Sequence, residues 1–473
     1  MDTTRQAAFA QPVGSPAEVA AGLRQLARWA FRLSFEAIPG AIQRRALLVL
    51  CDDIAAIVAA RAEPEIVRLQ EQMSAKPGVR EATIFRGGRI RADRYSAAVA
   101  NAAAADWCEL DEGYRRATCH AGLYTVPSLL AEAEAAGASA AELVRALVIG
   151  YEVAGRFARA FTFKSLVLHP HGCFAAVGAS AAVAALRRVP EDQFVAAVAA
   201  ASTMVAPGPF NHAVLGALVR NVWPAAGAWC GMRSVDWVAC GIGGLAESPY
   251  YVFVDAFGAD CHPGELTSGL GSEWAIADGY HKIHACCQYS HSAVEAALDL
   301  LGQMPRRPNA GEIERVTVEA HRLGMSLDNR KPATTLAAKF SLPHIVAATC
   351  VLGHAGAEAF ASTTLADPVI AGLRDRVELK PLARELPPPN DRGARVTLWL
   401  KDGAPRTAEC LSARGGPDRP FAAAEIEQKI ARITESVYPA FPGVAKRLIA
   451  AEAALLRRGW ADIVTAITGV EPS

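Results

Sequence analysis

Apolar residues recur at helical spacing along most of residues 1–268, whereas the β-branched runs typical of strands are scarce there. This spacing predicts a series of helices. One of them begins with a capping box, Ser139 with Glu142, and a later one opens at Pro190. The helices are expected over residues 15–33, 39–60, 95–110, 126–136, 139–161, 174–186, 191–204 and 225–240. Because their many Ala and Gly residues let helix axes approach closely, the pattern predicts an all-α domain with helices stacked in depth.

The pattern changes over residues 269–411. Residues 313–320 alternate apolar and polar positions as a strand does, and residues 394–400 with 407–411 predict a hairpin. Helices are expected at residues 291–301 and 342–353. This part of the chain therefore predicts a smaller α+β unit.

Beyond residue 412 the spacing is helical again, over residues 422–436 and 444–458. Helices at both ends of the chain, with an α+β unit between them, suggest that the end returns to the first domain. We expect a mainly α protein: one large helical domain built from residues 1–268 and 412–473, with residues 269–411 inserted as a smaller α+β lid. A length of 473 residues also favours more than one domain.

Composition narrows the class of protein. Basic and acidic side chains balance at 48 each without a basic run, which argues against a nucleic-acid partner. The 11 Cys are odd in number and form no CxxC pair, which is typical of reduced thiols rather than of a disulfide framework. The start of the chain lacks a signal-peptide pattern, and apolar runs such as 174–186 are too short for a bilayer. We expect a cytoplasmic protein without a membrane partner.

Carboxylates gather where an Ala-rich run ends. They are followed by His120 and comprise Asp106, Glu109, Asp111 and Glu112. Carboxylates that end a buried helix must be solvated, paired or held in a polar pocket. The spacing fits an acidic, solvated loop as well as a polar site.

Two histidines, His169 and His171, flank Pro170 directly before the helical run that begins at Phe174. A residue before proline is held in extended geometry, and the start of the next helix offers free N–H groups and a positive dipole. This arrangement can seat a carboxylate. A polar loop between two helices is the alternative.

Basic residues stand out in three further segments. Arg220 precedes a Trp-Pro-Ala-Ala-Gly run, and a guanidinium there would grip a carboxylate bidentately unless it is an ordinary exposed side chain. Lys282 lies among three His and two Cys in residues 281–291. That cluster could suggest zinc, but its spacing is not that of the usual Cys/His frameworks, so we expect no metal site. Arg330 lies before residues 338–344 and fits a solvated loop equally well.

Together these segments resemble the MmgE/PrpD family. In the acidic segment Asn101, Asp111 and His120 fit the family's pattern, whereas Asp106 stands where the family usually has His and Glu109 replaces an Asp. The resemblance also implies the expected architecture, a helical domain built from both chain ends with an α+β lid, and a homodimer.

The other segments carry the same resemblance. His169 matches the family's H-P-T-G element, Arg220 stands where the family carries a substrate-contacting Lys, and Lys282 matches a substrate-facing Lys. Residues 340–343 read F-S-L-P as in the family, but His344 replaces the following Tyr.

The resemblance implies roles for these residues. Catalytic roles are expected for His169, His120, Lys282, His344 and Asp111, and substrate binding for Arg220, Asp106, His171, Arg330 and Ser341. We take His169 as the first candidate for the base. We expect Arg220 to anchor a carboxylate rather than transfer protons, because a guanidinium stays charged. His120 and His169 should face Lys282 and His344 across one interdomain cleft.

Members of the family include 2-methylcitrate dehydratases, cis-aconitate decarboxylases and an iminodisuccinate epimerase. Each forms or quenches a carbanion next to a carboxylate, which requires a base and nearby cations. We therefore expect a metal-independent lyase without a cofactor, acting on a small di- or tricarboxylic acid, first of all a hydro-lyase of the 2-methylcitrate dehydratase type. A decarboxylase, an epimerase or isomerase of a related acid, and a non-catalytic binding relative are the alternatives.

Overall fold

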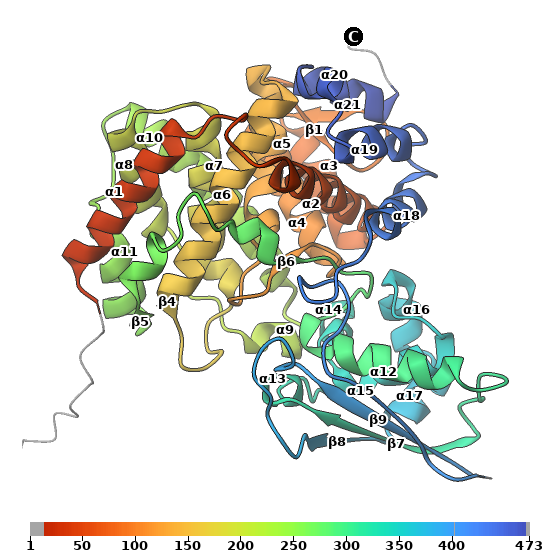
Figure 1. Cartoon of the computed structure of the whole chain (residues 1–473). Coiled ribbons are helices and arrows are strands. Elements are labelled where there is room, and N and C mark those ends of the chain that lie inside the picture. The colour runs from red at the N-terminus through yellow and green to blue at the C-terminus, as the bar shows by residue number, and fades with distance from the viewer. Residues whose placement is uncertain (1–13, 402, 470–473) are drawn as a thin grey trace, which may run out of the picture.

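The computed structural model describes residues 14–401 and 403–469. The described chain is mainly α, as predicted (Figure 1). Helices from the beginning and the end of the chain form the larger part, at the top and left of Figure 1, and a sheet with its own helices forms the smaller part at lower right. None of the described helices combines the length and the hydrophobicity needed to cross a bilayer.

The larger part follows the predicted helices closely. Its helices are α1 (Pro16–Arg32), α2 (Gly40–Ala59), α3 (Pro64–Ala75), α4 (Arg94–Trp107), α5 (Ala121–Ala136), α6 (Ala140–Ala160), α7 (Pro170–Leu186), α8 (Glu191–Ser202), α9 (Asn211–Leu215), α10 (Trp223–Ala239) and α11 (Ser248–Tyr250). Helices α3, α9 and α11 were not predicted, and α5 and α7 begin earlier than expected. They start directly after His120 and His169, which occupy the N-cap positions.

Short strand pairs hold the loops of this part. They are β1 (Ala82–Ile84) with β2 (Ile90–Ala92), β3 (Gly113–Tyr114) with β6 (Gly279–Tyr280), and β4 (Phe161–Thr162) with β5 (Asp260–Cys261). The β3–β6 pair joins the acidic segment to the chain that leads into the lid.

Helix α7 is the centre of the larger part, because every residue from Pro170 to Leu186 is buried. It packs against α5, α6, α8 and α10. Small residues permit this packing: a Cβ added at Gly231 of α10 would lie 2.6 Å from the Ala176 carbonyl oxygen. The close approach of helices that the Ala and Gly content predicts is therefore present here.

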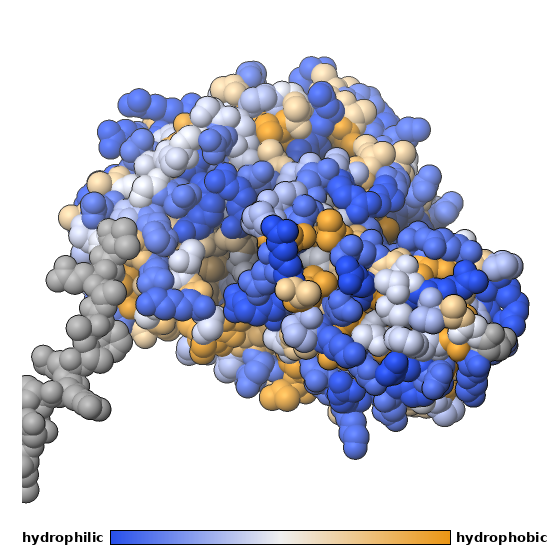
Figure 2. Space-filling view, turned by 60° about the horizontal axis from the view of Figure 1, so that its bottom comes forward, coloured by the Kyte–Doolittle hydropathy of each residue, from blue (hydrophilic) through white to orange (hydrophobic). Residues whose placement is uncertain are grey.

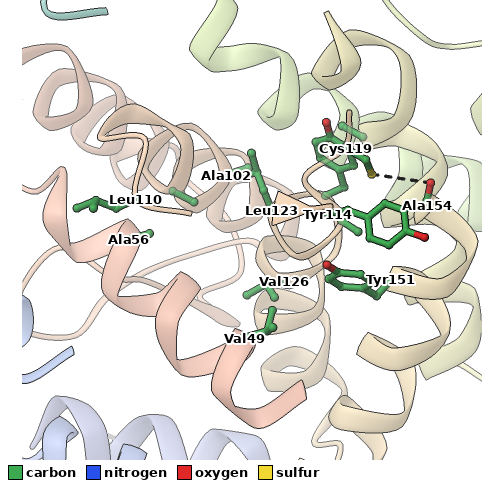
Figure 3. Close-up of a cluster of buried hydrophobic side chains, with 14 of the residues drawn as sticks. Val49, Ala56, Ala102, Leu110, Tyr114, Cys119, Leu123, Val126, Tyr151 and Ala154 are labelled. Atoms are coloured by element: carbon green, nitrogen blue, oxygen red, sulfur yellow. Dashed lines mark hydrogen bonds between the residues drawn. The ribbon is translucent and has the colours of Figure 1, made fainter. Parts of the chain in front are cut away.

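A buried apolar cluster lies beside the acidic segment (Figure 3). The Cys119 thiol of that segment points to the Ala154 carbonyl oxygen on α6, at 3.9 Å. The labelled residues come from α2, α4, α5, α6 and the segment itself: Val49, Ala56, Ala102, Leu110, Tyr114, Cys119, Leu123, Val126, Tyr151 and Ala154. Apolar packing thus fixes the backbone that carries the carboxylates.

The smaller part is an α+β unit built on a four-stranded sheet of order β10-β9-β7-β8. Its strands are β7 (Ile313–Ala320), β8 (Val377–Pro381), β9 (Ala394–Leu400) and β10 (Arg406–Cys410), and its helices are α12 (His291–Gly302), α13 (Arg322–Met325), α14 (Thr335–Lys339), α15 (Leu342–Leu352), α16 (Ser362–Leu365) and α17 (Pro368–Arg374). Strand β8, parallel to β7, was not predicted.

The chain ends in α18 (Ala423–Thr434), α19 (Phe441–Ile449), α20 (Ala453–Leu456) and α21 (Trp460–Thr468). Helices α18 and α19 pack on α2, and α21 packs on α5. The prediction of one helix over residues 444–458 is wrong. The backbone turns left-handed at Ala451, with φ 55°, and this turn separates α19 from α20.

A buried ion pair ties the end of the chain to its beginning. Lys429 of α18 places Nζ 2.7 Å from Asp52 Oδ1 on α2 and donates to the Leu110 carbonyl oxygen at 2.8 Å. The other oxygen of Asp52 is 2.7 Å from His281 Nδ1. Burial raises the pKa of Asp52, but Lys429 and His281 more than offset this and hold it below its usual value.

Lys429→Met should therefore lower the free energy of unfolding by about 3–5 kcal/mol, because it leaves the buried Asp52 charge without its cation. Urea unfolding followed by circular dichroism measures this loss. Arg447→Met is the matched control, since Arg447 and its partner Glu452 are largely exposed. A Lys429→Met protein as stable as this control would contradict the role given to the pair.

Candidate active site

Two permanent cations and three carboxylates meet where α4 ends. Arg220 Nη1 lies 2.6 Å from Glu109 Oε1 and 2.8 Å from both oxygens of Asp106. Lys282 Nζ lies 3.1 Å from Glu109 Oε2 and 3.5 Å from Asp111 Oδ1. All five side chains are buried. Glu109 thus bridges a cation from the larger part and a cation from the segment that leads into the lid.

Local backbone geometry places these groups. Asp106 lies in the last turn of α4, and Glu109 follows in the left-handed region at φ 53°, which few non-glycine residues adopt. The β3–β6 pair brings Tyr280, and with it Lys282, beside Gly113. Such backbone strain concentrates at functional sites.

His120 is oriented by a carboxylate. Its Nδ1 lies 2.6 Å from Asp111 Oδ2 and 3.0 Å from the Glu112 carbonyl oxygen. Burial raises the pKa of Asp111, but Lys282 and His120 outweigh this, so the pKa lies below its usual value and the carboxylate is ionised. Both partners of Nδ1 are then acceptors, so Nδ1 carries the proton and Nε2 is left as the basic nitrogen. His120 lines the small cavity that this cluster encloses, which makes it a candidate base.

His169 is held differently. At the N-cap of α7 its Nε2 accepts a hydrogen bond from Arg220 Nε at 3.2 Å. Because a neutral ring accepts at only one nitrogen, Nδ1, which lies 3.3 Å from the His171 backbone nitrogen, carries the proton. Burial, reinforced by the charge of Arg220, lowers the pKa of His169 well below its usual value, so the ring is neutral. Its Nε2 lone pair is directed at Arg220 in this structure, which makes His169 a partner of the anchoring cation.

His171 lies behind the cavity. Its Nε2 is 2.9 Å from Asp106 Oδ1, and its Nδ1 is 2.9 Å from the Tyr124 hydroxyl. Burial, followed by the charge of Arg220, lowers the pKa of His171 well below its usual value. His171 therefore supports Asp106 as a neutral ring.

The pKa values of the carboxyl groups are shifted in opposite directions. In Asp106 burial outweighs Arg220 and raises the pKa well above the usual value. In Glu109 burial is outweighed by Arg220 and Lys282, which lower the pKa. With Asp106 protonated, the ionised Glu109 and Asp111 balance the two cations. The cluster is then neutral before a ligand enters.

The cavity enclosed by these groups is small. It measures about 30 Å³, which is room for one or two water molecules. Its walls include Tyr280, Tyr289, Gln288, Arg392 and Phe340 from the side of the lid. Because ligand pockets usually measure roughly 300–1,000 Å³, a di- or tricarboxylate can enter only after part of the wall moves.

Comparison with known sequences identifies the family. Residues 24–213 match the model of the MmgE/PrpD N-terminal domain, and residues 284–455 match that of the MmgE/PrpD C-terminal domain. The chain belongs to the MmgE/PrpD family.

Curated MmgE/PrpD relatives point to lyase chemistry. The chain is similar to a cis-aconitate decarboxylase of Aspergillus terreus, at 26% identity over 352 residues, which cover 69% of this chain and 71% of the relative. It is also similar to a cis-aconitate decarboxylase-like protein of Aspergillus oryzae, at 24% identity over 439 residues, which cover 87% of this chain and 90% of the relative.

Within the MmgE/PrpD pattern, two replacements contact each other. The resemblance described above places Asp106 where the family usually has His and Arg220 where it carries Lys, and the two side chains lie 2.8 Å apart. Each replacement supplies the partner that the other needs in a buried setting.

Most of the predicted site residues meet in this cluster: His169, His120, Lys282, Asp111, Arg220, Asp106 and His171. The structure places the rest elsewhere in the lid. His344 Nδ1 lies 3.3 Å from Arg374 Nη1, so this ring faces α17 and not the cavity. Ser341 caps α15 by accepting from the His344 backbone N–H, and Arg330 pairs with Asp328 at 3.2 Å.

Sequence reasoning missed the central place of Glu109. It was noted among the carboxylates of the acidic segment but was not assigned to the site, because its bridge between Arg220 and Lys282 depends on a left-handed backbone that no spacing shows. The two lid tyrosines, Tyr280 and Tyr289, carried no sequence signal. Among the described residues, no group of three or more His, Cys, Asp or Glu is arranged to hold a metal ion.

The charge balance predicts a pH dependence of ligand binding. A carboxyl with a raised pKa keeps its proton until the pH rises through that raised value, and the cluster then gains one uncompensated negative charge at Asp106. The affinity for propane-1,2,3-tricarboxylate should therefore fall as the pH rises through the raised pKa of Asp106, as measured by isothermal titration calorimetry. Asp106→Asn should flatten this dependence, binding more tightly than the parent only above the raised pKa, where the parent carboxyl is ionised. An unchanged pH profile in this variant would refute the assignment.

Proposed function

We propose that the protein is a lyase that acts on a small di- or tricarboxylate through a carbanion next to a carboxylate. The main support is the convergence of one oriented histidine, His120, and two buried cations, Arg220 and Lys282, on one cavity. A carbon acid needs a base at the reacting carbon and cations at its carboxylate. The membership in the MmgE/PrpD family agrees with this chemistry.

In this proposal the cations hold the substrate. Arg220 and Lys282 now share Glu109, and a substrate carboxylate takes the place of Glu109 at one of them. As the carbanion forms, its charge spreads into that carboxylate, where the cation stabilises it more strongly than in the ground state. The enclosed setting strengthens this interaction because water is excluded.

His120 moves the proton. In a dehydration, Nε2 takes the proton from the carbon next to the carboxylate, the freed electron pair forms a carbon–carbon double bond, and the hydroxyl group on the adjacent carbon leaves as water with the proton that the His120 imidazolium gives back. In a decarboxylation, Nε2 first takes a proton from solvent, the bond to the leaving carboxylate breaks, carbon dioxide departs, and His120 gives its proton to the carbon that keeps the electron pair. Asp111 stabilises the imidazolium form in both cases.

Two observations favour different outcomes of the same chemistry. The oriented base favours proton abstraction and hence the hydro-lyase expected from the sequence. The cis-aconitate decarboxylases among the relatives favour decarboxylation. Histidine and two cations are sufficient groups for either reaction, so the proposal includes no cofactor.

Incubation with citrate, 2-methylcitrate, cis-aconitate and substituted succinates, followed by mass spectrometry, tests the proposal. Loss of water assigns a hydro-lyase, loss of carbon dioxide a decarboxylase, and inversion at unchanged mass an epimerase. Stabilisation of the protein by these acids without any turnover would leave only a binding protein and end the proposal.

The structure also predicts which histidine is the base. His120→Ala should lower kcat by roughly 10²–10⁴-fold with little change in KM, as expected for a positioned base. His169→Ala should mainly raise KM, because Arg220 loses the ring that holds its Nε. His354→Gln, at an exposed histidine, is the control and should match the parent. If His169→Ala loses kcat while His120→Ala keeps it, His169 is the base, as the sequence suggested.

A further inference from the structure

A second cavity adjoins the site. It measures about 540 Å³ and shares Ala117, Thr118 and Pro170 as walls with the small cavity of the cluster. The Thr118 hydroxyl lies 3.3 Å from the Tyr289 hydroxyl of the lid, so a single polar contact helps to close the common wall. We call the larger cavity the side groove.

Apolar side chains form a continuous part of the lining of the side groove, beside the polar residues Arg116, Thr118, Arg159, Thr162, His262 and Glu265. The apolar ones come from α6, from β4 and the loop after it, and from α7: Ala158, Phe161, Phe163, Leu166, Leu168 and Phe174. The loop after β4 lies at the bottom of the larger part in Figure 1, and Figure 2 turns the bottom of the molecule forward, where apolar residues gather among hydrophilic ones. Phe161 stacks on Phe253 at 4.8 Å between ring centroids, which gives the groove a packed floor.

The charged residues at the side groove are already paired. Arg159 Nε lies 3.1 Å from Glu265 Oε2, and Arg116 contacts Glu273 and Asp278 at 3.5 and 3.6 Å. These partners make the groove a poor seat for another carboxylate. Its chemistry fits an uncharged, apolar group that continues from a molecule held in the cluster.

We propose that the side groove binds an apolar chain carried by the substrate, so that the substrate class is a small polycarboxylate with an alkyl substituent of several carbons. The inference rests on the proposed function, because the cluster must hold the carboxylates of the same molecule. The shared wall fixes the direction of the chain: it leaves the reacting carbon beside His120 and passes Ala117, Thr118 and Pro170. These three residues are the ones that separate the two cavities.

Binding of 2-alkylsuccinates with chains from methyl to heptyl, measured by calorimetry on the full chain, tests the inference. Affinity should rise by roughly fourfold for each added methylene, the value of burying one CH₂, until the groove is filled. Alkylamines of equal length, which lack the carboxylates, should bind far more weakly. Equal affinity for all chain lengths would overturn the inference and leave the proposed function intact.

Two variants locate the chain. Ala158→Leu, which narrows the groove, and Leu166→Asn, on the loop, should each remove most of the gain from longer chains and leave methylsuccinate binding unchanged. Val167→Asn is the matched control, because Val167 is exposed beside Leu166 and does not line the groove. If Leu166→Asn weakens every acid equally, the groove is only an access route and the inference is wrong. If no carboxylic acid binds or reacts, the proposed function fails first.

Discussion

The bridge from Arg220 through Glu109 to Lys282 is the interaction on which the site depends. One cation comes from the helical part and the other from the chain that enters the lid, and both are buried. A buried charge without a partner costs several kcal/mol, about 3–5 when one member of a pair is removed. The site is therefore complete only when the segment that carries Lys282 packs against the helical part. This explains why the paired side chains leave only a small cavity between them.

The same bridge has to be partly broken for a substrate to bind in the proposed way. Under the proposed function, the carboxylate of the substrate competes with Glu109 for a cation. The left-handed backbone at Glu109 gives this residue a conformation that the surrounding packing has to maintain. Arg220 is committed to Asp106, Glu109 and His169 together. Lys282 has only longer contacts with carboxylates, at 3.1 and 3.5 Å, so it is the cation more readily released to a ligand.

Long helices could be predicted from the sequence because their apolar spacing persists over many residues. Their starts at α5 and α7 could not, since His120 and His169 are unusual N-cap residues. The short motifs pointed to most of the residues that lie together in the candidate site, because each motif corresponds to one backbone segment beside it. A motif does not show which way a side chain turns, and His344, found in a matching segment, points to Arg374. The role of Glu109 depends on the left-handed backbone at this residue, which a sequence motif does not show.

The Asp106–Arg220 contact shows how a buried polar group in the site is given a partner. Without the guanidinium, Asp106 would lie buried beside Glu109 and Asp111, whose charges raise its pKa further. A guanidinium offers separate donors, so Arg220 holds both Asp106 oxygens through Nη1 while Nε stays on His169. An ammonium group, a point charge, has no such fixed fork. The geometry of arginine is therefore what allows one cation to serve a carboxylate and a histidine at the same time.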